Sequence, residues 1–114
     1  MRCWWLFWIG TPAIASRSVV LKKLVLRGHQ VSVEAGAGTG SSISDAEYAA
    51  AGAKIVEGAD LVWADAEMVL KVKEPIAEEY HRMRSGQVLF TYLHLAASKA
   101  CTDALLSSGV TSIA

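Results

Sequence analysis

Strand-like and helix-like segments alternate along the whole of this 114-residue chain. The strand-like segments are short apolar runs, and the helix-like segments carry apolar residues three or four positions apart or begin with a capping residue. Such alternation produces β-α-β crossovers and a parallel sheet with helices on both faces. The predicted strands are residues 3–9, 31–33, 54–56, 68–72, 87–93 and 110–113, and the predicted helices are residues 18–26, 44–52, 60–65, 75–83 and 98–107.

The alternation therefore predicts an α/β domain of three layers around a parallel, Rossmann-like (flavodoxin-like) sheet. The length suits one domain and is too short for two. The last predicted strand, residues 110–113, runs almost to the end of the sequence at Ala114 without a turn or a polar tail. We expect from this that the domain is incomplete at its C-terminal end.

The charge composition argues against nucleic-acid and membrane-surface partners. Lys and Arg together number 11, Asp and Glu together also number 11, and the net charge is zero, so no basic surface is expected. Cys3 and Cys101 lack the spacing of metal ligands and fit reduced thiols in a cytoplasmic protein. No pair of histidines has metal spacing, so we predict no metal site.

The apolar N-terminal run Met1–Ile9, followed by Ala13-Ile14-Ala15, has some features of a secretory signal peptide. The run is far too short to span a bilayer, and its three tryptophans are unusual for a signal sequence. We interpret it as a buried first strand.

The glycine-rich segment Gly36-Ala37-Gly38-Thr39-Gly40 lies between a predicted strand and a predicted helix, as a dinucleotide-binding loop does. The fingerprint G-x-G-x-x-G requires a third glycine where this chain has Ser41, and the helix begins only at Ser44. The segment also lacks the lysine of a P-loop. We favour a surface loop that shapes a cleft over a nucleotide-binding loop.

A lysine and a histidine follow two neighbouring apolar strands. Lys73 comes directly after residues 68–72, and His94 comes at the end of residues 87–93. The carboxyl ends of neighbouring parallel strands are where α/β sheets bind ligands, so we expect both side chains to face one small-molecule pocket. An ammonium group can hold a carboxylate or polarise a carbonyl oxygen, and an imidazole can transfer protons near neutral pH.

The pattern alone leaves other interpretations open. Lys73 can be a solvated lysine, and His94 can be a structural, hydrogen-bonded histidine. Lys71 competes with Lys73, because residues two apart on a strand point to the same face. Thr91 and Tyr92 suit a pocket lining and a buried strand equally well.

Five stretches of the chain form a recognisable set: Arg27-Gly28-His29, Glu34-Ala35-Gly36-Ala37-Gly38, Ala51-Gly52-Ala53, Leu70-Lys71-Val72-Lys73-Glu74-Pro75 and Leu89 through Ser98. Through these stretches the chain resembles, from Leu24 to Ala114, the N-terminal part of bacterial alanine dehydrogenase. The related transhydrogenase α subunit shares this domain but is not expected to carry Leu93-His94-Leu95-Ala96, so His94 favours alanine dehydrogenase.

The resemblance implies an enzyme that oxidises L-alanine reversibly to pyruvate and ammonia with NAD, in the cytoplasm. It implies that Lys73 binds the substrate near its carboxylate and carbonyl, and that His94 is the general acid/base. It also implies that NAD is bound by a domain that this chain lacks, that the full-length protein is a hexamer, and that the chain alone is inactive or nearly so. The alternatives are a domain of a transhydrogenase α subunit and a module that binds a small keto or amino acid.

The first 18 residues do not share the resemblance, so we divide the chain into a divergent segment with a first strand and loop, residues 1–18, and the substrate domain, residues 19–114. The family carries a substrate-binding arginine in its first loop, and a gapless extension places Ala13 there, with Arg17 out of register. One hypothesis is a shifted reading frame across residues 9–18, which the DNA sequence would test directly.

Overall fold

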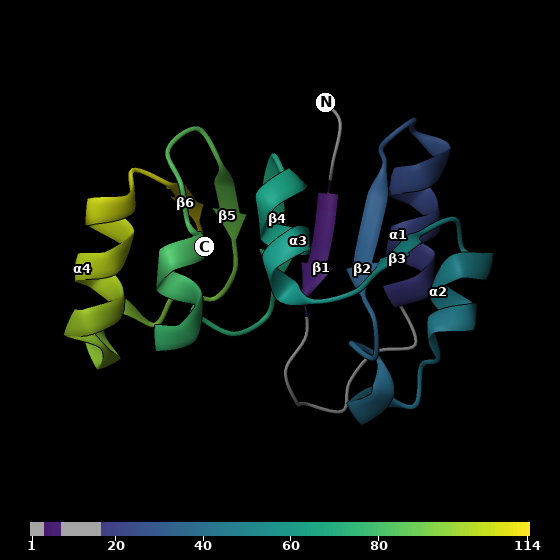
Figure 1. Ribbon diagram of the computed structural model, residues 1–114, viewed down its shortest axis with the longest axis horizontal. Helices are drawn as coiled ribbons and strands as arrows, with labels where there is room; N and C mark the ends of the chain where they lie inside the picture. Colours follow the sequence, from purple (N-terminus) through teal and green to yellow (C-terminus); the bar gives the residue numbers. More distant parts are fainter. Residues whose placement is uncertain (1–3, 8–16) are drawn as a thin grey trace.

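The computed structural model describes residues 4–7 and 17–114, with side chains from residue 19 onward, and these residues form one six-stranded sheet (Figure 1). All neighbouring strands are parallel, in the order β3-β2-β1-β4-β5-β6. The predicted parallel α/β fold is confirmed, and its strand order is the Rossmann order and not that of flavodoxin. The strands are β1 (Trp4–Phe7), β2 (Val31–Glu34), β3 (Lys54–Val56), β4 (Met68–Lys71), β5 (Val88–Phe90) and β6 (Thr111–Ile113).

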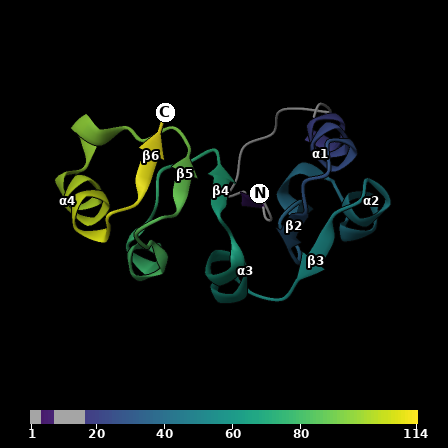
Figure 2. The same cartoon turned by 90° about the horizontal axis from the view of Figure 1, so that it is seen from above.

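Helices cover the two halves of the sheet from opposite faces (Figure 2). On one face, α1 and α2 pack against β2, and on the other, α3, η2 and α4 pack against β4 and β5. The helices are α1 (Arg17–Leu26), α2 (Asp45–Ala50), α3 (Ala59–Asp65) and α4 (Lys99–Ser108), and the 3-10 helices are η1 (Thr39–Ser41), η2 (Ala77–Arg82) and η3 (Leu95–Ala97). No helix of the described residues is long and apolar enough to cross a membrane.

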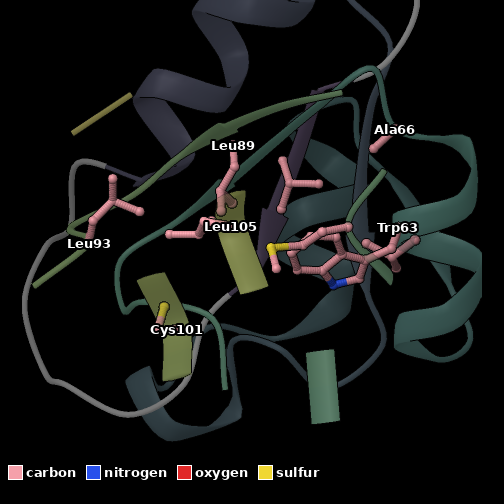
Figure 3. Close-up of a cluster of buried hydrophobic side chains, with 9 residues drawn as sticks. Trp63, Ala66, Leu89, Leu93, Cys101 and Leu105 are labelled. Carbon is pink, nitrogen blue, oxygen red and sulfur yellow. The ribbon is translucent and has the colours of Figure 1, made fainter. Parts of the chain in front are cut away.

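Two apolar clusters result from this arrangement. The cluster under α1 and α2 includes Leu21, Val33 and Tyr48. The cluster between α3, α4 and the strands is drawn in Figure 3 and contains Val62, Trp63, Ala66, Val69, Met83, Leu89, Leu93, Cys101 and Leu105. Cys101 is a buried free thiol, whereas Cys3 lies outside the described residues.

The cross-strand register shows which part of the sheet each layer covers. Val33, Leu70, Phe90 and Ile113 lie in one row across β2, β4, β5 and β6, with β1 between β2 and β4. Val33 is buried beneath α1 and α2, but Phe90 is 44% exposed and Ile113 is 46% exposed. On this face, therefore, the helical layer covers the β2 side of the row and leaves the β5–β6 side open.

The helix predicted over residues 75–83 is instead the short 3-10 helix η2. Its first turn is organised by Glu79, whose side chain points inward and accepts a hydrogen bond from the Ile76 amide at 2.9 Å. Glu78 and Arg82 are four residues apart, but their side chains form no ion pair. Arg82 Nε donates to Asp60 Oδ1 at 2.6 Å, and its Nη1 donates to the Glu78 carbonyl oxygen at 2.8 Å.

The start of the second helix, predicted at Ser44, is confirmed, and it is a capping box. The Ser44 hydroxyl accepts a hydrogen bond from the Glu47 amide, and the Glu47 carboxylate accepts one from the Ser44 amide. The loop before it is also held from within, because the Gly36 amide donates to the Asp45 carboxylate at 2.9 Å. The glycine-rich segment is thus a turn in which the amide of its first residue, Gly36, is already hydrogen-bonded to Asp45.

Gly38 is needed for packing. A Cβ atom at this position would lie 2.3 Å from the carbonyl oxygen of Ile43 and 2.8 Å from Cε2 of Tyr48, whereas a Cβ at Gly40 would meet nothing within 4 Å. We expect Gly38→Ala to lower the free energy of unfolding by about 1–3 kcal/mol, the usual cost of overpacking. Urea unfolding followed by circular dichroism would measure this, with Gly40→Ala as the matched control. Equal stabilities of the two variants would contradict the packing role.

Candidate active site

The carboxyl ends of β4 and β5 meet at one edge of the sheet. The strands pair in register from Met68 with Val88 to Leu70 with Phe90. Beyond them, the Tyr92 amide donates to the Val72 carbonyl at 3.2 Å, and the Thr91 hydroxyl donates to the Lys73 carbonyl at 2.8 Å. The segments that carry Lys73 and His94 are therefore tied together by hydrogen bonds.

The strand order reverses next to this edge, between β1 and β4. β4 pairs on its other side with β1, and from β1 the order continues to β2 and β3. Ligands of open α/β sheets bind at such a switch point, outside the carboxyl ends of the strands. The segment that follows β1, including Ala13 at the position expected for a substrate arginine, lies outside the described residues.

Burial separates the two candidate lysines. The Lys71 ammonium forms an ion pair with the Glu79 carboxylate, both side chains are 2% exposed, and the ammonium lies 5.9 Å from the centre of the Trp63 ring. Burial lowers the pKa of Lys71, and the charge and hydrogen bond of Glu79 oppose this effect. Lys73 is exposed at the sheet edge, and within the described part of the chain it forms no ion pair.

His94 lies four residues beyond the end of β5 and contacts Glu74, the residue that follows Lys73. Its Nδ1 is 3.0 Å from Oε2 of Glu74, and its ring stacks on Tyr92 with 6.4 Å between ring centres. The backbone of His94 is left-handed, with φ of 47° and ψ of 41°. This conformation is uncommon for a residue with a Cβ atom, and strained backbone of this kind clusters at functional sites.

The Glu74 carboxylate is well suited to accept a hydrogen bond. The hydrogen bond with His94 is the largest cause that holds the pKa of Glu74 below its ordinary value, and the nearby Lys73 charge acts in the same direction. Glu74 is thus ionised at neutral pH, and a proton on Nδ1 of His94 would point at it. The edge then combines an exposed ammonium, an imidazole and a carboxylate, the groups needed to bind an anionic substrate and move a proton.

Two features of this edge are not evident from the sequence. The sequence pattern does not single out Glu74, although its place between Lys73 and Pro75 puts it at the predicted strand end. Thr91 is buried and holds the Lys73 carbonyl, whereas Tyr92 is exposed beside His94. Among the described residues, no group of three or more His, Cys, Asp or Glu side chains could hold a metal ion.

The contrast between the lysines predicts a difference in stability. Lys71→Ala would leave the Glu79 carboxylate buried without its cation, and removing one partner of a buried pair costs about 3–5 kcal/mol. Lys73→Ala removes an exposed side chain and should change the free energy of unfolding by less than about 0.5 kcal/mol. Urea unfolding of both variants measures the difference. Similar losses in the two variants would contradict the structural role of Lys71.

The hydrogen bond between His94 and Glu74 predicts a change in a pKa. His94→Ala should raise the pKa of Glu74 towards its ordinary value, because the main cause that lowers it is removed. The lowered pKa of Glu74 stabilises the folded state at pH values above the pKa that Glu74 has in the unfolded chain. This stabilisation is lost as the pH falls through the pKa of Glu74 in the folded state. Carboxyl NMR titration measures the shift, with Glu47 as an internal control, since its pKa is lowered by Ser44. An unchanged pKa of Glu74 would contradict the contact.

Comparison with known proteins identifies the family of this fold and site. The family described as "Alanine dehydrogenase/PNT, N-terminal domain" matches residues 13–114. The chain is 67% identical over 92 residues to the alanine dehydrogenase of Mycobacterium tuberculosis, covering 81% of this chain and 25% of that protein. It is 53% identical over 94 residues to that of Bacillus subtilis, covering 82% of this chain and 25% of that protein.

Solved structures agree with the sequence comparison. A structure of L-alanine dehydrogenase matches with a TM-score of 0.82 and 38% identity, over 100% of this chain and 32% of that one. The transhydrogenase from Sinorhizobium meliloti matches with a TM-score of 0.82 and 33% identity, over 97% of this chain and 33% of that one. The chain thus spans about a quarter of the length of the curated relatives it matches, and it belongs to the alanine dehydrogenase/PNT N-terminal domain family.

Proposed function

We propose that this chain is the substrate-binding and proton-transferring part of an L-alanine dehydrogenase. The observation that carries the proposal is that Lys73 and His94 follow two adjacent parallel strands, next to the switch point, in segments held together through Thr91 and Tyr92. The identity of 67% to an alanine dehydrogenase supports this enzyme within the family. The reaction converts L-alanine, NAD⁺ and water to pyruvate, ammonium, NADH and a proton.

In this proposal Lys73 and His94 have separate roles. The Lys73 ammonium binds the substrate carboxylate and steadies the oxygen that becomes the carbonyl of pyruvate. His94 is the general acid/base: its Nε2 accepts a proton from the water that adds to the imine carbon and returns a proton to the departing amine. An exposed lysine is accessible to an anion, which the buried Lys71 is not.

NAD⁺ is the hydride acceptor of this reaction. Among the described residues, the glycine-rich segment does not form a loop that fits its phosphates. The Gly36 amide donates to Asp45, and Gly38 packs against Ile43 and Tyr48. A phosphate would have to compete with the Asp45 carboxylate for the same amide. We therefore assign NAD binding to a part of the relatives' length that this chain does not span. The division at residue 18, the cytoplasmic location and the hexameric assembly stay predictions.

A transhydrogenase domain is the second candidate, because the Sinorhizobium meliloti structure matches with a TM-score equal to that of L-alanine dehydrogenase. The two candidates differ in the ligand expected at the carboxyl ends of β4 and β5. An alanine dehydrogenase site takes a small keto or amino acid, whereas a transhydrogenase acts on nicotinamide nucleotides.

Binding of pyruvate by the chain tests the proposal. In ¹H–¹⁵N NMR titrations, pyruvate should perturb the amides of residues 72–74 and 91–94, and Lys73→Met should weaken binding about tenfold through loss of a charge-assisted contact. Lys54→Met is the matched control, because Lys54 is an exposed lysine at the opposite, amino-terminal end of β3. Absence of pyruvate binding would contradict the proposal, and perturbation by NADH alone would favour a transhydrogenase.

A further inference from the structure

The closest polar contact of His94 is with Glu74, and it involves only one of the two ring nitrogens. Nδ1 lies 3.0 Å from Oε2 of Glu74. Because an ionised carboxylate has no proton to donate, this contact is a hydrogen bond only if Nδ1 carries the proton. The neutral ring then has its basic lone pair on Nε2, and the hydrogen bond made by one nitrogen determines the state of the other.

The surroundings of this pair hold it in place. Glu74 lies between Lys73 and Pro75. The Lys73 carbonyl accepts a hydrogen bond from the Thr91 hydroxyl, and Pro75 is buried. His94 has a left-handed backbone and a ring stacked on Tyr92. Both partners are thus attached to well-defined backbone, and their contact joins the end of β4 to the end of β5.

We propose that Glu74 is a positioning residue that keeps the proton of neutral His94 on Nδ1, so that Nε2 is the nitrogen presented for proton transfer. The catalytic consequence rests on the proposed function, but the effect on the imidazole does not. A simple surface ion pair would require a protonated ring, whereas the positioning role persists when the ring is neutral. The ionised state of Glu74 at neutral pH, which follows from its lowered pKa, is consistent with this role.

The tautomer of His94 can be read directly from the ¹⁵N chemical shifts of its ring, measured on the chain at alkaline pH, where imidazole side chains are neutral. In the wild type the Nδ1–H form should dominate. Glu74→Met keeps the length of the side chain but removes the acceptor, and it should lower the ratio of Nδ1–H to Nε2–H by about fivefold, the upper range for an exposed charged pair. His81 is an internal control, because its Nε2 lies 4.0 Å from the nearest Asp60 oxygen.

Two further variants make the result specific. Glu74→Gln retains an oxygen that can accept from Nδ1–H, and it should restore part of the ratio lost in Glu74→Met. Glu57→Met removes an exposed carboxylate elsewhere and should leave His94 unchanged. A ratio that is the same in the wild type and in Glu74→Met, with both spectra showing a folded chain, would overturn the proposal. If the ratio shifts as expected while pyruvate does not bind, the positioning role stands and the proposed function fails.

Discussion

The site depends on the parallel pairing of β4 with β5. This pairing brings together two segments that are separated by about twenty residues in the sequence, and it continues beyond the strands through hydrogen bonds to the carbonyls of Val72 and Lys73. Parallel strands place their carboxyl ends at one edge, so the segments that follow the two strands begin at the same edge of the sheet. Without this register, Glu74 would not lie within reach of His94.

Burial gives two lysines in the same sequence segment different roles. Lys71 is the last residue of β4, and its side chain lies on the face of the sheet that α3, η2 and α4 cover. There its ammonium forms an ion pair with the Glu79 carboxylate, beside the Trp63 ring. Lys73 lies beyond the strand and is exposed. A buried charge is tolerated only when it is paired, so Lys71 is part of the structure that supports the edge, and Lys73 is accessible to a ligand.

The two halves of the sheet differ in how completely they are covered. α1 and α2 bury Val33 in β2, but Phe90 and Ile113 in the same cross-strand row remain exposed. A parallel sheet normally has both faces covered. Among the residues that the structure describes, helices cover the β5–β6 side on one face.

The sequence by itself determined the fold class, because strand-like and helix-like periodicities follow from local residue spacing. It also located the helix start at Ser44 and the segments after the strands that carry Lys73 and His94, since capping residues and Pro75 act over a few positions. Only the tertiary structure decided the strand order and the choice between the lysines. It also decided the conversion of residues 77–82 into a 3-10 helix and the contact of Glu74 with His94. These features depend on groups that are distant in sequence or on the orientation of a side chain within a turn, and neither is encoded in local periodicity.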